Sequence, residues 1–180
     1  MSLLCFFCLV QLSASAPDFE SKYKKPVIDF RHYASGLAMM GPERDEYATN
    51  LASIVVKTIR DAKGDQDSLD FGSKVLGLAL HLSPRNKKAL IANAQLSSGV
   101  LPKPIPADYD LEVFSKLLIN RSKILEQSEG EKNKEVAGYF IALAALLDPR
   151  NEDAVYAAEI RKIDHGEANW KVVTGEIKKP

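Results

Sequence analysis

The chain has 180 residues, with 24 basic and 24 acidic side chains, 46% hydrophobic positions and two cysteines. This length and composition are typical of one soluble globular domain and exclude a chain that is disordered throughout. A net charge of zero argues against a nucleic-acid-binding protein, which needs an excess of Lys and Arg on one face. Two cysteines are too few for a small fold that several disulfide bonds stabilise.

The first 16 residues carry no charged side chain, and the apolar stretch 3–12 is followed by four small residues. This order predicts a secretory signal peptide at 1–16. The stretch is shorter than the roughly 20 residues that cross a bilayer as a helix, so we predict no permanent membrane span. A buried N-terminal strand or helix is the alternative. With a cleaved leader, the protein is exported and is periplasmic, bound to the cell envelope or secreted.

The next part of the chain contains a capping segment and a first helical repeat block. Scattered prolines and glycines predict a capping segment at 17–42 with at most one short helix, around 31–40. Helical spacing of apolar residues then predicts a first repeat block at 43–99. Its last helix begins after Asn86, which we expect to be the N-cap. The predicted helices of this block are 43–63, 68–82 and 87–97.

A proline-rich linker, V-L-P-K-P-I-P-A at 100–107, follows the first block. Its three alternating prolines prevent a helix and favour an extended connector, although such a segment can also be a ligand for another domain. Helical spacing resumes in a second repeat block at 108–164, and 165–180 forms a C-terminal tail. The predicted helices of this block are 109–127, 133–147 and 151–163.

The two blocks share a repeated sequence. Ser83-Pro84-Arg85-Asn86 recurs 65 residues later as Asp148-Pro149-Arg150-Asn151. At the same offset Ala79 aligns with Ala144. Repeated helical hairpins predict a solenoid, because each hairpin exposes an apolar face that only its neighbour can cover.

The strings A-L-H-L-S-P-R-N-K-K-A-L and A-L-L-D-P-R-N-E-D-A-V resemble the junction between tetratricopeptide repeats. In that family a helix ends in Ala-Leu-x-Leu-Asp-Pro and the next helix starts after an Asn. The resemblance covers 43–163 and implies an all-α fold, a right-handed α-solenoid of antiparallel helical hairpins with about six main helices. Asn93 and Ala158 replace a leucine that is usual in the family. A closed helical bundle with coincidental P-R-N turns is the alternative.

The resemblance also implies a function and a site. In tetratricopeptide proteins the solvent-facing side of the first helix of each repeat lines a groove that holds a peptide or a partner domain. The resemblance therefore implies an exported scaffold that binds a protein or peptide partner. The groove positions that it assigns in this chain are Lys88, Ile91, Gln95, Asp153, Tyr156 and Ile160.

Residues that could carry chemistry are scattered. The histidines His32, His81 and His165 lie in different segments, without the spacing of metal ligands. We therefore predict no catalytic residue, no metal site and no cofactor; we expect His81 to face solvent and Trp170 to dock against the last helix. Two alternatives stay open: a small-molecule binder or enzyme with a cleft near His32, and a purely structural part of a longer repeat array.

Overall fold

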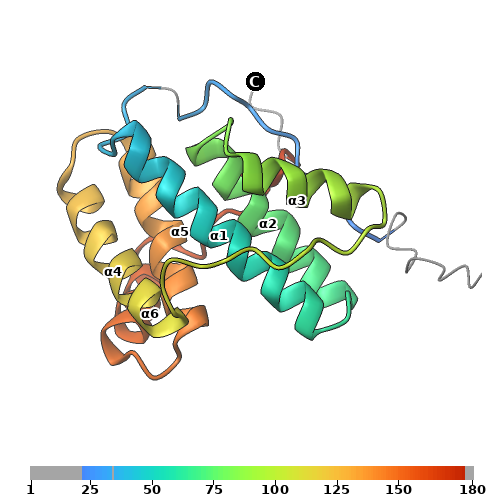
Figure 1. Ribbon diagram of the computed structural model, residues 1–180. Helices are drawn as coiled ribbons and strands as arrows, with labels where there is room; N and C mark the ends of the chain where they lie inside the picture. Colours follow the sequence, from blue (N-terminus) through green and yellow to red (C-terminus); the bar gives the residue numbers. More distant parts are fainter. Residues whose placement is uncertain (1–21, 34, 177–180) are drawn as a thin grey trace, which may run out of the picture.

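The computed structural model describes residues 22–33 and 35–176, and the predicted leader at 1–16 lies outside them. Regular structure in this part is entirely helical, so the all-α prediction is confirmed for the described residues (Figure 1). Six helices are longer than ten residues, and the seventh is a single turn. The helices are α1 (Gly41–Asp61), α2 (Gln66–Leu82), α3 (Lys87–Ser97), α4 (Leu111–Gln127), α5 (Glu131–Leu147), α6 (Glu152–His165) and α7 (Lys171–Thr174).

Side-chain caps begin most of the long helices. The Asn86 side chain accepts a hydrogen bond from the N–H of Ala89 at 2.9 Å, which confirms Asn86 as the N-cap of α3. Asn151 caps α6 in the same way, by accepting from the N–H of Ala154 at 3.2 Å. Each cap satisfies a backbone donor that the first turn of a helix leaves without a partner.

The helices form two units of three, which we call the first unit (α1–α3) and the second unit (α4–α6). In each, two long helices form a hairpin and the third packs against it. The hairpin helices α2 and α5 have 17 residues each and start 65 positions apart, as the repeat in the sequence predicts. The third helix is tied to the first by its cap residue: Asn86 Nδ2 lies 2.8 Å from the Thr49 hydroxyl, and Asn151 Nδ2 lies 3.0 Å from the Ser115 hydroxyl.

These contacts relate α1 to α4 at an offset of 66 positions, one more than the offset of the other helices. Burial confirms this register. Five of the six buried residues of α4 correspond to buried residues of α1, and the sixth corresponds to half-buried Thr49. The two units therefore bury the same faces of their first helices. The matched pairs are Phe114 with Ala48, Ser115 with Thr49, Leu118 with Ala52, Ile119 with Ser53, Ser122 with Val56, and Leu125 with Ile59.

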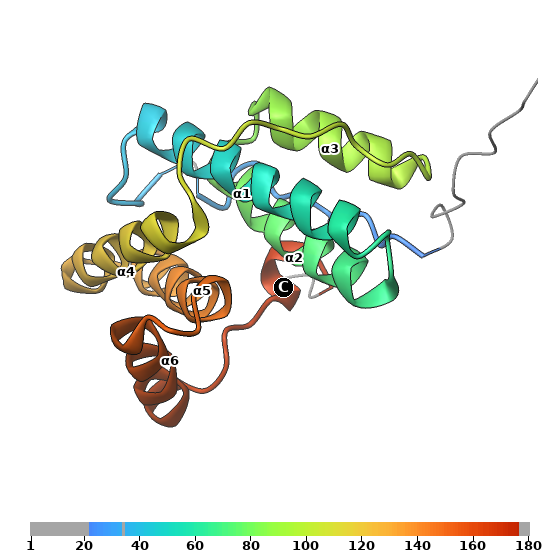
Figure 2. The same cartoon turned by 60° about the horizontal axis from the view of Figure 1, so that its bottom comes forward.

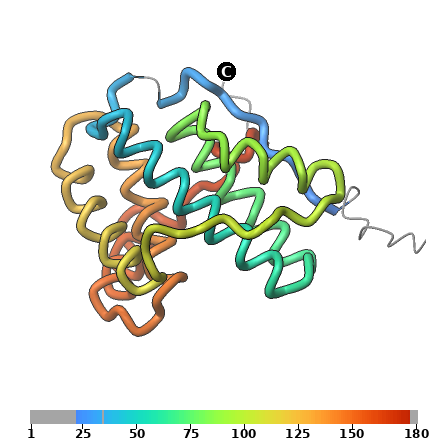
Figure 3. Tube along the Cα trace, in the orientation of Figure 1, coloured from blue at the N-terminus to red at the C-terminus, as the bar shows by residue number. Residues whose placement is uncertain are grey.

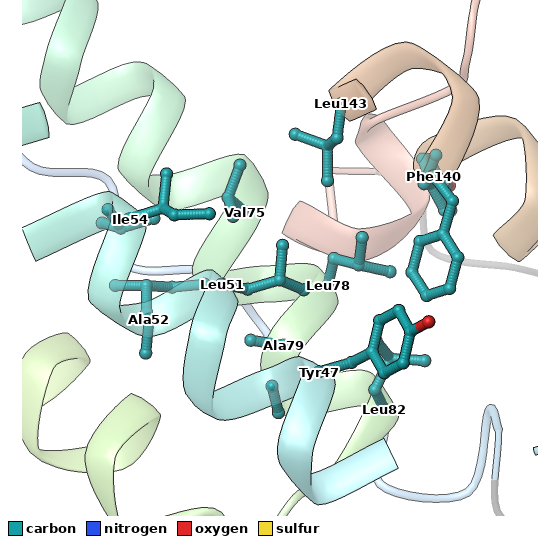
Figure 4. Packing of buried hydrophobic residues seen from close by; sticks show 14 of the residues in the cluster. Tyr47, Leu51, Ala52, Ile54, Val75, Leu78, Ala79, Leu82, Phe140 and Leu143 are labelled. Carbon is teal, nitrogen blue, oxygen red and sulfur yellow. The ribbon is translucent and has the colours of Figure 1, made fainter. Parts of the chain in front are cut away.

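Long side chains join the two units. Among the described residues, no helix of the first unit brings a Cα atom within 8 Å of a helix of the second. The ring of Tyr47 on α1 stacks on that of Phe140 on α5, with centroids 5.2 Å apart, and lies 5.8 Å from the ring of Phe114 on α4. Leu78 and Leu82 of α2 lie beside this pair (Figure 4). Aromatic side chains thus fill the space between backbones that are far apart.

Three non-helical segments lie over the helices. The part of the capping segment at 22–40 runs along the first unit with a turn at 30–33, and its described positions between 31 and 40 form no helix. The linker at 100–107 contains no helix and crosses α1 on its way to α4 (Figure 3). The chain after α6 returns to α2, where α7 packs. No helix in the described part is both long and apolar enough for a membrane crossing.

Candidate functional site

Helix α6 is the most exposed of the six long helices. Ala154 is its only buried residue, whereas α3, its counterpart in the first unit, buries four. Apolar side chains of α6 that face solvent include Tyr156, which is 70% exposed, and Ile160, which is 40% exposed. An exposed apolar surface of this kind marks a place where a partner can bind. A hollow lies along each side of the helix.

The first hollow, which we call the α4–α6 groove, has a volume of about 500 Å³. Three of the six predicted groove residues line it, namely Asp153, Tyr156 and Ile160 on α6. One ion pair links the two walls, because Arg161 Nη1 lies 3.1 Å from Glu126 Oε1. The α4 wall consists of Ile119, Ser122, Lys123 and Glu126.

The second hollow, which we call the α2–α5–α6 cleft, has a volume of about 640 Å³. It lies between the two units, and the chain at 166–170 forms part of its wall. Its apolar lining includes the side chains of Leu146, which is 60% exposed, and of Trp170. A concave apolar surface of this size is the default candidate for a binding site. Further apolar lining residues are Phe71, Val75, Ile141, Leu143 and Ala158.

Arg161 separates the two hollows and holds α6 in place. Its side chain pairs with Glu126 on α4 and donates a hydrogen bond from Nη2 to the carbonyl of Lys134 on α5 at 2.8 Å. The guanidinium reaches α5 over Gly138, where an added Cβ atom would lie 2.6 Å from Arg161 Nε. A glycine at this position therefore gives the arginine room to fasten α6 to the α4–α5 hairpin.

In the first unit, segments of the chain itself cover both sides of α3. On the α2 side, the Tyr23 hydroxyl donates to Asn93 Oδ1 at 2.8 Å, and the Ser73 hydroxyl donates to the Lys24 carbonyl at 2.6 Å. On the α1 side lies the linker at 100–107, held by hydrogen bonds from Ser53 and Arg60. The corresponding surfaces of the second unit are the α2–α5–α6 cleft and the α4–α6 groove.

The other three predicted groove residues lie on α3. Lys88 and Ile91 are exposed and Gln95 is half-buried. Helices α3 and α6 lie at opposite ends of the molecule (Figure 2), and among the described residues none of their Cα atoms approach within 8 Å. The structure therefore brings together the set on α6 but does not bring the set on α3 into the same groove. The α4 wall was not predicted from the sequence. It corresponds to α1 at the offset of 66, which only the contacts of Asn86 and Asn151 establish.

The prediction that His81 faces solvent is wrong, because the residue is only 3% exposed. Its Nδ1 lies 2.8 Å from the Gly77 carbonyl, and its Nε2 accepts a hydrogen bond from the N–H of Asp29 at 3.3 Å. These partners define a neutral imidazole that carries its proton on Nδ1. Burial lowers the pKa of His81 below its ordinary value near 6.5, which favours the same neutral form. The capping segment covers this histidine.

The neighbouring polar residues also fasten the capping segment. His32 Nε2 lies 3.2 Å from Glu135 Oε2 on α5, and the ring of Tyr33 lies 4.4 Å from that of His32. Burial, with the nearby Glu135 carboxylate, raises the pKa of Tyr33, so its hydroxyl stays protonated. Tyr33 and His81 line a third hollow of about 530 Å³. No serine, threonine or cysteine of the described residues is hydrogen-bonded to a histidine.

Trp170 docks on α5, so the prediction that it docks against α6 is wrong. Its ring lies 4.8 Å from that of Tyr139 on α5, and it reaches α6 only across the cleft. The Tyr139 hydroxyl donates to the Asn169 carbonyl at 2.8 Å, which fixes the chain beside the tryptophan.

Within the described residues, no group of three or more His, Cys, Asp and Glu side chains is arranged to hold a metal ion.

No family model, no curated protein and no solved structure is significantly similar to this chain.

Proposed function

We propose that this protein is a helical scaffold that binds a peptide segment of a protein partner beside α6. The observation that carries the proposal is the difference between the two units. Extended segments of the chain cover both sides of α3, whereas both sides of α6 are open hollows edged by exposed apolar side chains. In the first unit, the surfaces on both sides of α3 are thus covered by segments of the chain itself. In the second unit, the corresponding surfaces beside α6 are open to a partner.

Charge around the α2–α5–α6 cleft favours an apolar segment with basic residues. The rim carries three acids, Asp67, Asp70 and Glu159, and one lysine, Lys74, and none of these four forms an ion pair within the described residues, so the acids outnumber the base. The two basic residues of α6 on the same rim are already paired, Arg161 with Glu126 and Lys162 with Glu167. Complementary charge around an apolar contact steers association and sets its register.

We also propose that the scaffold is similar to tetratricopeptide repeats. It is supported by two similar units of helical hairpins, 65 residues apart, with alanine at the helix crossings. The opposite positions of α3 and α6 argue against a single concave groove, so the proposed partner binds beside α6 alone.

The predicted leader gives the proposal a location. If 1–16 is a signal peptide, the scaffold meets its partner in the periplasm, on the cell envelope or outside the cell. N-terminal sequencing of the protein from an envelope or secreted fraction should then find a mature chain that starts at Ala16 or Pro17. A chain that retains Met1 would remove the proposed export but leave the binding surface as it stands.

Selection from a displayed library of random peptides tests the binding function. We expect enriched peptides to bind the purified chain, and we expect Tyr156→Glu or Leu146→Glu to weaken binding about tenfold or more, since each places a charge in one of the hollows. Fluorescence anisotropy with labelled peptides measures the affinity.

Ile163→Glu is the matched control, because Ile163 is an exposed apolar residue of α6 that lines neither hollow. The control variant should bind like the parent. Selected peptides that bind all three variants equally, or a selection that enriches no peptide, would contradict the proposed function.

A further inference from the structure

The first unit shows how an extended segment binds beside a third helix. The Ser53 hydroxyl donates a hydrogen bond to the Ile105 carbonyl at 2.7 Å, and Arg60 Nη1 donates to the Pro102 carbonyl at 2.9 Å. Pro102 is buried and Ile105 is half-buried against the core. Side chains of α1 therefore hold the linker by its backbone carbonyls, while its apolar side chains pack on the helices.

The α4–α6 groove occupies the surface of the second unit that corresponds to the linker-binding surface of α1 in the first unit. At the offset of 66 that relates α1 to α4, the two linker-binding residues Ser53 and Arg60 correspond to Ile119 and Glu126. Both of these line the groove, as do the residues equivalent to Val56 and Lys57. The α4 wall of the groove is thus the counterpart of the surface that carries the linker in the first unit.

No described segment of the chain covers the α4–α6 groove of the second unit. After α3 the chain returns along α1 as the linker, but after α6 it turns the other way and packs α7 against α2. The groove is therefore left open on a surface whose counterpart binds an extended segment with prolines at alternate positions.

The side chains of the groove define the occupant further. Tyr156 is 70% exposed at the edge of the groove, and aromatic residues recognise proline-rich segments because the polyproline II conformation loses little entropy on binding. Glu126 replaces the donor Arg60 by an acceptor; its Oε1 pairs with Arg161, but its side chain stays 41% exposed. Among the described residues, two further acids of the groove, Asp153 and Asp164, form no ion pair, against one such lysine, Lys123. An acidic residue at this end favours a basic side chain in the occupant, in place of the carbonyl that Arg60 binds.

We infer that the α4–α6 groove binds an extended, proline-containing segment of a partner protein, with apolar side chains packed against α4 and a basic residue near Glu126. This inference rests on the proposed function and specifies the class of its ligand. The linker is the internal template for this ligand, because its sequence L-P-K-P-I-P combines the same features.

A labelled peptide with the sequence of 99–108 is the probe, compared with the same peptide carrying alanine in place of its three prolines. We expect the proline peptide to bind the full chain about fivefold or more tightly than the alanine peptide, because the prolines reduce the entropy lost on binding. Tyr156→Ala should weaken the proline peptide about tenfold, and Ile163→Ala should leave its affinity unchanged.

A charge-reversal variant of Glu126 distinguishes specific recognition of the peptide from nonspecific binding. Glu126→Lys should weaken the proline peptide, and a peptide with glutamate in place of its lysine should regain affinity for this variant. Equal binding of the proline and alanine peptides, or no binding of either, would overturn the inference. If peptides from the random library still bind beside α6 in that case, the proposed function stands and only the proline-rich ligand is wrong.

Discussion

Replacing Ala144 with arginine should lower the free energy of unfolding by about 3 to 5 kcal/mol, since it buries a charge without a partner. Ala144 is fully buried where α5 crosses α4, and its carbonyl accepts a hydrogen bond from the Ser115 hydroxyl at 2.9 Å. The crossing depends on a small side chain, because packed helices lie only about 8 to 10 Å apart. Urea denaturation followed by far-ultraviolet circular dichroism measures the loss.

Leu146→Arg is the control for this substitution, because Leu146 lies on the same helix but is 60% exposed. Its arginine can reach water, and we expect a change within about 0.5 kcal/mol. The same reasoning applies to Ala79, the equivalent residue in the first unit, which is also fully buried. If Ala144→Arg and Leu146→Arg unfold at the same urea concentration as the parent, the packing of the α4–α5 hairpin is not as described.

The sequence predicted the helices well because their boundaries are encoded locally. Asn86 and Asn151 cap the third helix of each unit, and the prolines two residues before them end the preceding helices. Other ends shifted by two residues: α1 spans Gly41–Asp61, α2 starts at Gln66, α4 starts at Leu111, α5 starts at Glu131 and α6 ends at His165. A capping side chain and a proline act within one turn of helix, so they can be recognised without knowledge of the tertiary structure.

The candidate site could be predicted only in part, because it depends on which surfaces the non-helical segments cover. The resemblance to tetratricopeptide repeats implied the face of α6 that lines the α4–α6 groove. The burial of His81 was missed, since the residues that cover it come from 29–33, a segment without helical periodicity. The linker on α1 likewise has no pattern that shows where it packs. Segments of this kind decide which of two equivalent grooves is open, and their path follows from tertiary contacts.

Replacing Phe140 with alanine tests the junction of the two units. Phe140 is fully buried and stacks on Tyr47 of α1 with its ring 5.2 Å away, at a point where the backbones of the two units stay apart. Removal of the ring leaves a cavity that the distant backbones cannot close, and we expect a loss of about 3 to 5 kcal/mol in the free energy of unfolding. Trp170, the only tryptophan, packs on Tyr139 of α5, so its fluorescence reports on the loss of this contact when the second unit unfolds.

The two spectroscopic probes show whether the junction also couples the units. In the parent chain, Trp170 fluorescence and far-ultraviolet circular dichroism should give the same urea midpoint, as expected for one cooperative transition. In Phe140→Ala the fluorescence midpoint should fall below that of the circular dichroism, because the second unit then unfolds before the first. Tyr156→Ala is the control: this ring is 70% exposed, and its removal should change stability by no more than about 0.5 kcal/mol. Coincident midpoints together with a loss below about 1 kcal/mol would show that the aromatic stack does not hold the units together.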